Sequence, residues 1–452
     1  MGFDETEKWW NDHFREYVED LKGFVEIPSI AKKDEDGYPF GRPCHDMLLY
    51  ISSLMERYGL DVSIINDVFA KGSYNKSAKK TIAIACHGDV VPVGEGWERS
   101  PFELFEKEDH LVGRGTTDNK GATIAVLYAL RFLKECGYKS RHDFALLVGS
   151  AEEIGMHDVP IAFPNGNGAM LTLVPDSGFP LSYGEKASLK VSTRIPLVGN
   201  TIKSITAGLG TGVIDRAECV YNGTASAFAS DGIEIDGNII VSKGKARHSA
   251  TPEGGECAFS KLLKYLDKSS LLNGESSLKR LIDFFPDFYG TGLGVDFEDE
   301  ESGRLSAVIT KVETKGHELF VTINFRFPSF LKPEELFEKV KEKLPLSELS
   351  SSSSGYKTEL TKELLAINEI SNRIYSADRK PYIMAGGTYA RVMQPAVAFG
   401  MGSPLGNKKP PFEEGEGRAH QRNESVDIDR MKKGFMIYSE ALRYLDGVLA
   451  DE

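Results

Sequence analysis

Short apolar runs alternate with helical segments through the first part of the chain, and this alternation constrains the fold more than any other feature. The runs at 81–85, 144–148 and 170–174 are typical of buried strands. Apolar residues at helical spacing predict helices over 46–58 and 121–133. Strands that alternate with helices form a mostly parallel sheet with helices on both faces. The sequence therefore predicts an α/β domain.

A different pattern follows, one typical of an antiparallel sheet. Asp236-Gly237 lies between two apolar runs and predicts a β-hairpin. Residues 319–327 alternate strictly between apolar and polar side chains, so one face of the strand packs and the other can meet solvent or ligand. A helix over 333–344 and a linker-like serine run at 350–354 are expected next. These elements predict an α+β domain.

The pattern of the first part returns near the end of the chain. A strand is expected at 397–399 and a helix over 427–445. Because this pattern stands on both sides of the α+β segment, we interpret the chain as an α/β domain with an inserted α+β domain. The α/β domain is assigned to 1–183 and 366–452, and the insertion to 184–365.

Charge and composition exclude several classes of partner. The 452 residues include 54 basic and 67 acidic ones, a formal net charge of −13, which disfavours nucleic acid and anionic membrane surfaces. The acidic first residues predict no signal peptide, and no apolar run reaches the ~18 residues of a membrane helix. Sparse cysteines, odd in number, argue for a reducing, cytoplasmic location. These are Cys44, Cys86, Cys136, Cys219 and Cys257.

Potential metal ligands follow the apolar runs of the first part or begin its helix. They are His87, Asp89, Asp118, Glu152, Glu153 and Asp176. In an open α/β sheet, sites form outside the carboxyl ends of the strands, where such residues converge. Carboxylates this close repel one another unless cations neutralise them. A metal site is therefore predicted here, with ordinary polar loop chemistry as the alternative. Three other histidines, His110, His142 and His157, are interpreted as surface residues.

Spacing suggests roles within this set. His87 and Asp89 are two residues apart, which places both on one side of an extended segment, as a metal ligand and its orienting carboxylate require. Glu152 and Glu153 are adjacent, so their side chains diverge, and one can coordinate while the other acts as a base. Asp118 could bridge two ions.

Several motifs resemble those of one enzyme family. In the first part they lie at 86–92 (CHGDVVP), 113–121 (GRGTTDNKG), 151–155 (AEEIG) and 175–176 (PD); further along they lie at 244–252 (GKARHSATP), 386–391 (GGTYAR) and 419–424 (AHQRNE). Together they resemble the dinuclear metallopeptidases that include aminoacylase, carnosinase and carboxypeptidase G, and most closely the bacterial dipeptidase V (PepV) branch. The resemblance runs from about Glu7 to Leu445. It implies a phosphorylase/hydrolase-like catalytic domain with an inserted lid domain.

The resemblance also implies two divalent metal ions per chain, with zinc favoured and manganese or cobalt as alternatives. Their ligands would be His87 and Asp176 for one ion, Glu153 and His420 for the other, and Asp118 as the bridge. Asp89 would orient His87, and Glu152 would be the general base. The family also has a cis peptide bond after the bridging aspartate, here Asp118-Asn119.

Further residues are implied in substrate binding. His248, from the insertion, would donate to the tetrahedral oxyanion, with a surface histidine as the alternative. Arg326 would bind the substrate's terminal carboxylate, with a surface ion pair as the alternative. Gly387 and Thr388 would assist. Where the branch has a lid asparagine in a T-N-M-V-P-like segment, residues 211–216 of this chain read TGVIDR, which puts that contact and the side-chain preference in doubt.

The predicted function is that of a metal-dependent dipeptidase, with a dipeptide or other small molecule as substrate. An amidohydrolase that removes an acetyl or succinyl group from an N-acyl amino acid is the alternative, because the same metal site serves both reactions. A binding protein that kept the fold and lost the chemistry is disfavoured by the retained base and ligands. A cytoplasmic monomer is expected.

Overall fold

The computed structural model describes residues 2–210, 212–222 and 230–450. The chain divides into two compact units, the first made of Met1–Gly184, Thr358–Tyr382 and Gly387–Glu452, the second of Glu185–Lys357 and Ile383–Gly386. The domain boundaries expected from the sequence, after 183 and after 365, stay a prediction.

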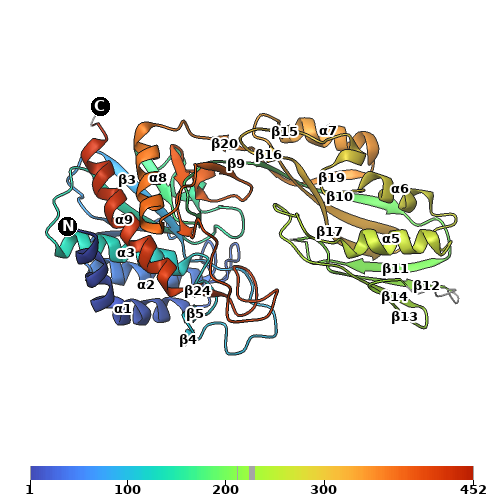
Figure 1. Cartoon of the computed structure of the whole chain (residues 1–452), viewed down its shortest axis with the longest axis horizontal. Coiled ribbons are helices and arrows are strands. Elements are labelled where there is room, and N and C mark those ends of the chain that lie inside the picture. Colours follow the sequence, from blue (N-terminus) through green and yellow to red (C-terminus); the bar gives the residue numbers. More distant parts are fainter. Residues whose placement is uncertain (1, 211, 223–229, 451–452) are drawn as a thin grey trace. The chain divides into compact units, whose positions relative to one another are not determined.

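The first unit is built on a mixed sheet with the strand order β1-β2-β6-β3-β7-β22-β9 (Figure 1). Its strands are β1 (Asp61–Ile65), β2 (Phe69–Ser73), β3 (Thr81–His87), β6 (Asp143–Gly149), β7 (Leu171–Val174), β9 (Ser182–Glu185) and β22 (Ala396–Ala398). The central strands β6, β3, β7 and β22 run parallel, whereas β1, β2 and β9 pair antiparallel. The predicted parallel centre and its strands are confirmed.

Helices cover this sheet. They are α1 (Phe3–Val25), α2 (Arg42–Arg57), α3 (Lys120–Glu135), α4 (Val159–Ala162), α8 (Lys362–Tyr375) and α9 (Ile428–Val448). Helix α2 packs on β1 and β2, and α3 packs on β3 and β6. Figure 1 shows the N-terminal helix α1 beside the C-terminal helix α9, with which it is in contact. In the described part of the chain, no helix combines the length and apolar character needed to cross a membrane.

Short elements link these layers. They are β4 (Phe105–Lys107), β5 (His110–Val112), β8 (Ser177–Gly178), β21 (Tyr382–Met384), the 3-10 helix η2 (Tyr389–Arg391), β23 (Met401–Gly402) and β24 (Ser425–Asp427). Strand β24 pairs antiparallel with β5, and β23 pairs parallel with β8. These pairings bring segments from the end of the chain beside segments of the first 180 residues.

The second unit is an antiparallel sheet with the order β13-β14-β12-β11-β17-β18-β10-β19. The strands are β10 (Ala187–Pro196), β11 (Ile202–Ala207), β12 (Arg216–Tyr221), β13 (Ile233–Asp236), β14 (Ile239–Lys243), β17 (Ser306–Lys315), β18 (Glu318–Phe327) and β19 (Ser347–Ser353). Helices α5 (Ala258–Lys268), α6 (Ser276–Phe284) and α7 (Pro333–Lys343) pack against it. The Asp236-Gly237 hairpin and the alternating burial of β18 are confirmed.

One expected element of this unit is wrong. The serine run at 350–354 was expected as a linker, but most of it belongs to β19, which pairs antiparallel with β10 at the edge of the sheet. Most of the side chains of β19 are exposed, so the strand shows no apolar alternation. Its backbone pairing with β10 forms the strand, and side-chain hydropathy carries no signal of that pairing.

Two of the three histidines interpreted as surface residues are buried. His110 is 5% exposed and His142 is 0% exposed, whereas His157 is exposed. His142 lies before β6, where its backbone N–H and its ring Nδ1 both lie 2.9 Å from Oδ1 of Asp446 on α9. The other carboxylate oxygen of Asp446 accepts the Tyr138 hydroxyl at 2.8 Å. Asp446 therefore fastens the last helix to the start of a central strand.

We expect Asp446→Ala to lower the free energy of unfolding by about 3 kcal/mol, because several buried donors lose their acceptor at ~1–3 kcal/mol each. Burial alone would raise the pKa of Asp446, but the N–H groups of His142 and Arg141 and the Tyr138 hydroxyl outweigh it and lower the pKa. The contribution is therefore complete above the carboxyl's unfolded-state pKa and is lost as pH falls through the folded-state pKa.

Urea unfolding at a series of pH values measures this contribution. Glu440→Gln on the same helix is the control, because it removes only a surface ion pair with Arg373, which is worth less than about 1 kcal/mol. An Asp446→Ala variant that is as stable as the wild type at neutral pH would show that the carboxylate does not hold the helix.

Candidate active site

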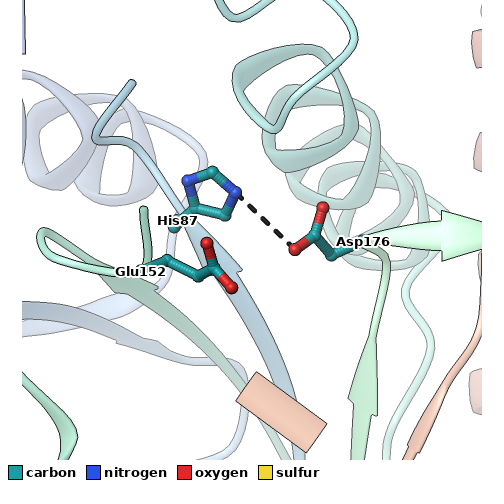
Figure 2. A group of neighbouring side chains, drawn as sticks. All are labelled: His87, Glu152 and Asp176. Atoms are coloured by element: carbon teal, nitrogen blue, oxygen red, sulfur yellow. Dashed lines mark ion pairs between the residues drawn. The ribbon is translucent and has the colours of Figure 1, made fainter. Parts of the chain in front are cut away.

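The predicted ligands of the first unit lie at the carboxyl ends of neighbouring parallel strands. His87 is the last residue of β3, Glu152 and Glu153 follow β6, and Asp176 follows β7. Because β6 and β7 both pair in parallel with β3, their carboxyl ends reach the same edge of the sheet. Figure 2 shows the carboxylates of Glu152 and Asp176 turned toward the His87 imidazole.

Asp118 lies between two histidines that are 333 residues apart in the sequence (420 − 87). Its Oδ1 is 3.0 Å from Nε2 of His87, and its Oδ2 is 3.0 Å from Nε2 of His420. The same His420 nitrogen is 3.2 Å from Oε1 of Glu153, and the same His87 nitrogen is 3.7 Å from Oδ2 of Asp176. The structure thus brings all five predicted metal ligands together, with one carboxylate oxygen of Asp118 facing each imidazole.

Among the residues that the structure describes, two overlapping groups of side chains could each hold a metal ion. His87, Glu152 and Asp176 form one group, and His87, Asp118 and Glu153 form the other, with the ligand atoms of each group within 4.8 Å of one another. Imidazole and carboxylate ligands without thiolate suit zinc, manganese or cobalt. Glu152, expected as a base free of metal, therefore lies within reach of a ligand position as well.

The electrostatics of this cluster favour bound cations. Burial, with the neighbouring carboxylates adding to it, raises the pKa of Glu152, and the same causes raise that of Glu153 to about 7 and also raise that of Asp176. The carboxylates of Asp118 and Glu153 raise the pKa of His420 to about 11. Buried carboxylates that repel one another in this way are stabilised by divalent cations, so the donor set fits a metal centre.

Asp89 was expected to orient His87, but its carboxylate lies closer to the loop that carries Glu152 and Glu153. The His87 Nδ1 faces the main-chain oxygen of Asp89 at 3.0 Å, and the carboxylate Oδ1 lies farther away at 3.5 Å. The two carboxylate oxygens instead accept the backbone N–H groups of Glu152 and Glu153, at 3.1 and 3.0 Å. Asp89 therefore ties the end of β3 to the loop that carries both glutamates.

The residue after Asp118 contacts another predicted ligand, Asp176. The Asp118-Asn119 peptide bond is cis, as the resemblance implied. The side-chain amide of Asn119 donates to the main-chain oxygen of Pro175 at 2.8 Å and to Oδ1 of Asp176 at 3.1 Å. Asn119 thereby orients the carboxylate of Asp176.

Sequence reasoning assigned no role to a buried ion pair beside Asp118. Arg114 and Glu424 are 1% and 0% exposed, and Nη1 of Arg114 lies 2.6 Å from Oε2 of Glu424. The other oxygen of Glu424 accepts the backbone N–H groups of Thr117 and Asp118, both at 3.0 Å. Arg114 also donates to the main-chain oxygen of Gln421 at 3.2 Å. The pair thus positions both Asp118 and the segment of His420. Both residues stand inside the quoted motifs, but their spacing does not indicate that they meet.

The turn at Gly387 and Thr388 belongs to the first unit. Thr388 is 2% exposed, and its hydroxyl accepts the backbone N–H of Ala390 at 3.1 Å, which caps η2. A Cβ at Gly387 would lie 3.2 Å from the guanidinium of Arg391. A substrate contact at this turn stays a prediction.

His248, Arg326 and Gly212 belong to the second unit. His248 is exposed, and its Nδ1 accepts the backbone N–H of Ala250 at 3.2 Å. Arg326 lies on the polar face of β18. Gly212 pairs with His248 in an isolated antiparallel bridge, and a Cβ at Gly212 would lie 2.6 Å from the main-chain oxygen of Arg247. A branch-like asparagine at 212 would therefore require this bridge to shift. Thr211, in the same segment, lies outside the described residues.

The chain is similar to known peptidases. The model of peptidase family M20/M25/M40 matches residues 83–444. A protein of Staphylococcus saprophyticus named "Putative dipeptidase" is 26% identical to this chain, over a match that covers 96% of this chain and 98% of that protein.

Solved structures share the fold. Human carnosine dipeptidase 1 has a TM-score of 0.62 at 13% identity and covers 98% of this chain and 99% of its own. The di-peptidase Dug1p of Saccharomyces cerevisiae has a TM-score of 0.61 at 14% identity and covers 99% of this chain and 98% of its own. The predicted architecture, a catalytic α/β part with an inserted α+β part, is confirmed. Membership of the dipeptidase V branch stays a prediction.

Proposed function

Since the chain belongs to peptidase family M20/M25/M40 and is thereby a peptide-bond hydrolase, we propose that it is a dipeptidase with two divalent metal ions per chain. The observation that carries this proposal is the position of Asp118, whose two oxygens each face one imidazole, that of His87 and that of His420. The relatives named as dipeptidases, similar over nearly the whole chain, support the substrate class.

The residues of the cluster suit two ions. His87 and Asp176 would hold one ion, Glu153 and His420 the other, and Asp118 would serve both. Bound zinc, or manganese or cobalt in its place, would polarise the scissile carbonyl and lower the pKa of water.

Glu152 would move the proton. Its carboxylate would take a proton from the attacking water and deliver it to the leaving amine. Burial, together with the neighbouring carboxylates, raises the pKa of Glu152 above its usual value, which favours a carboxylate that takes up a proton. The Asp89 carboxylate, which accepts the N–H groups of Glu152 and Glu153, would keep this carboxylate directed at the cluster.

The residues proposed for substrate binding rest on motif resemblance. His248 would donate to the developing oxyanion, and Arg326 would bind the terminal carboxylate, which its place on a polar strand face supports. Backbone and side-chain groups of Gly387 and Thr388 would assist. A pocket that binds both ends of a dipeptide would exclude longer peptides.

Initial rates on alanyl dipeptides and on N-acetyl and N-succinyl amino acids test the function. We expect the purified, zinc-loaded enzyme to hydrolyse dipeptides at least ten times faster, by kcat/KM, than the acylated amino acids. Faster removal of an acyl group would reassign the protein as an amidohydrolase with the same metal site.

A cytoplasmic, monomeric enzyme is also proposed. The structure shows all five cysteines as free thiols, which supports a reducing compartment. Sedimentation of the purified protein tests the monomer, and a dimer at micromolar concentration would refute it.

A further inference from the structure

The loop that carries Glu152 and Glu153 is held by two buried carboxylates. Oδ2 of Asp158 accepts the backbone N–H groups of Ser150 and Ala151, at 2.8 and 3.0 Å. The Asp89 carboxylate accepts the next two, from Glu152 and Glu153. Four consecutive N–H groups therefore end on carboxylate oxygens, which fixes the backbone directly before and at the proposed base.

Asp158 is itself held by a tyrosine from a distant segment. The Tyr389 hydroxyl donates to Oδ2 of Asp158, the same oxygen that accepts from Ser150 and Ala151. Asp158 is 0% exposed and Tyr389 is 1% exposed. The Tyr389 ring also stands edge-on to the His87 imidazole, with the ring centroids 6.4 Å apart. Tyr389 thus contacts the imidazole of His87 and donates to Asp158, the residue that holds the backbone directly before Glu152.

The space for this pair is provided by a glycine. A Cβ at Gly149, the last residue of β6, would lie 1.9 Å from the Tyr389 hydroxyl oxygen and 2.5 Å from Oδ2 of Asp158. Real Cβ atoms do not approach other atoms so closely, so any other residue at 149 would push the pair apart. The strand end is therefore shaped around the hydrogen bond between Tyr389 and Asp158.

We propose that Asp158 and Tyr389 are positioning residues that direct the Glu152 carboxylate at the metal site. This inference rests on the proposed role of Glu152 as the general base. The Tyr389 hydroxyl fixes the rotamer of Asp158, and Asp158 fixes the N–H groups of the two residues before Glu152. Misplacing a catalytic group by about 1 Å can cost on the order of 10²-fold in rate, so a loosened loop should slow the chemical step.

Tyr389→Phe tests this, because it removes only the hydroxyl. We expect kcat on a dipeptide to fall about 10- to 100-fold, with KM within about twofold of the wild type and both metal ions retained. Tyr128→Phe is the matched control. Tyr128 is also fully buried, and its hydroxyl donates to the carboxylate of Asp20, on α1, at 2.8 Å. A loss of this hydrogen bond should leave kcat unchanged. Asp158→Asn provides a second variant if Tyr389→Phe does not fold, and the same fall in kcat is expected.

A double variant separates positioning from general weakening. If Tyr389 acts through Glu152, adding Tyr389→Phe to Glu152→Gln should lower the residual turnover by less than about twofold, because effects through one group are not additive. An unchanged kcat in Tyr389→Phe, an equal loss in both backgrounds, or a loss explained by missing metal would each overturn the inference. Retained turnover in Glu152→Gln alone would instead overturn the assignment of the base.

Discussion

Glu152→Gln should lower kcat by about 10²–10⁴-fold while the protein still binds two metal ions per chain. General bases contribute rate factors of this size, and glutamine cannot accept the proton of the attacking water. The side chains are nearly equal in volume, so the loop around position 152 should keep its backbone contacts with Asp89. Turnover on a dipeptide and metal content by mass spectrometry measure both quantities on one preparation.

The metal content decides what a loss of activity means. Glu152 lies within 4.8 Å of the ligand atoms of His87 and Asp176, so it could also serve as a ligand. A variant that loses one ion would show that Glu152 binds metal, and a variant that keeps its activity would place the base elsewhere. Glu103→Gln is the control, because Glu103 makes an exposed ion pair with Arg99 away from the proposed ligands, and it should behave as the wild type.

Asp118→Ala should remove both metal ions and reduce turnover to background. Asp118 contacts both imidazoles, so its loss should weaken the binding of each ion by more than about 100-fold. Loss of a residue that only supports a ligand already costs about 10- to 100-fold in metal affinity. Equilibrium dialysis against zinc followed by metal analysis measures the two affinities.

His420→Ala is the matched comparison for this variant. It removes a ligand from the Glu153 side alone, so one ion should stay bound beside His87 and Asp176. An Asp118→Ala variant that still binds two ions with unchanged affinity would show that this carboxylate is not a bridge.

Much of this site could be predicted from the sequence. Ligands that directly follow buried parallel strands reach one edge of a sheet, which is why His87, Glu152, Glu153 and Asp176 were expected together and are found together. His420 follows no strand and has a positive φ of 65° in an irregular loop. Only the resemblance of its motif pointed to it.

The pairs that support the site could not be predicted. Arg114 meets Glu424 across 310 residues, and Tyr389 meets Asp158 across 231. Hydropathy periods report which face of an element is buried, and they carry no information about which buried polar groups pair across the fold. The edge strand β19 was not predicted for a related reason. Its exposed serines show no apolar alternation, and hydropathy carries no information about its backbone pairing.

Anomalous diffraction from crystals of the zinc-loaded enzyme tests the central claim most directly. We predict two peaks per chain on either side of Asp118, one beside His87 and Asp176 and the other beside Glu153 and His420. A single peak, or a fully active enzyme whose metal lies away from these five residues, would contradict the account.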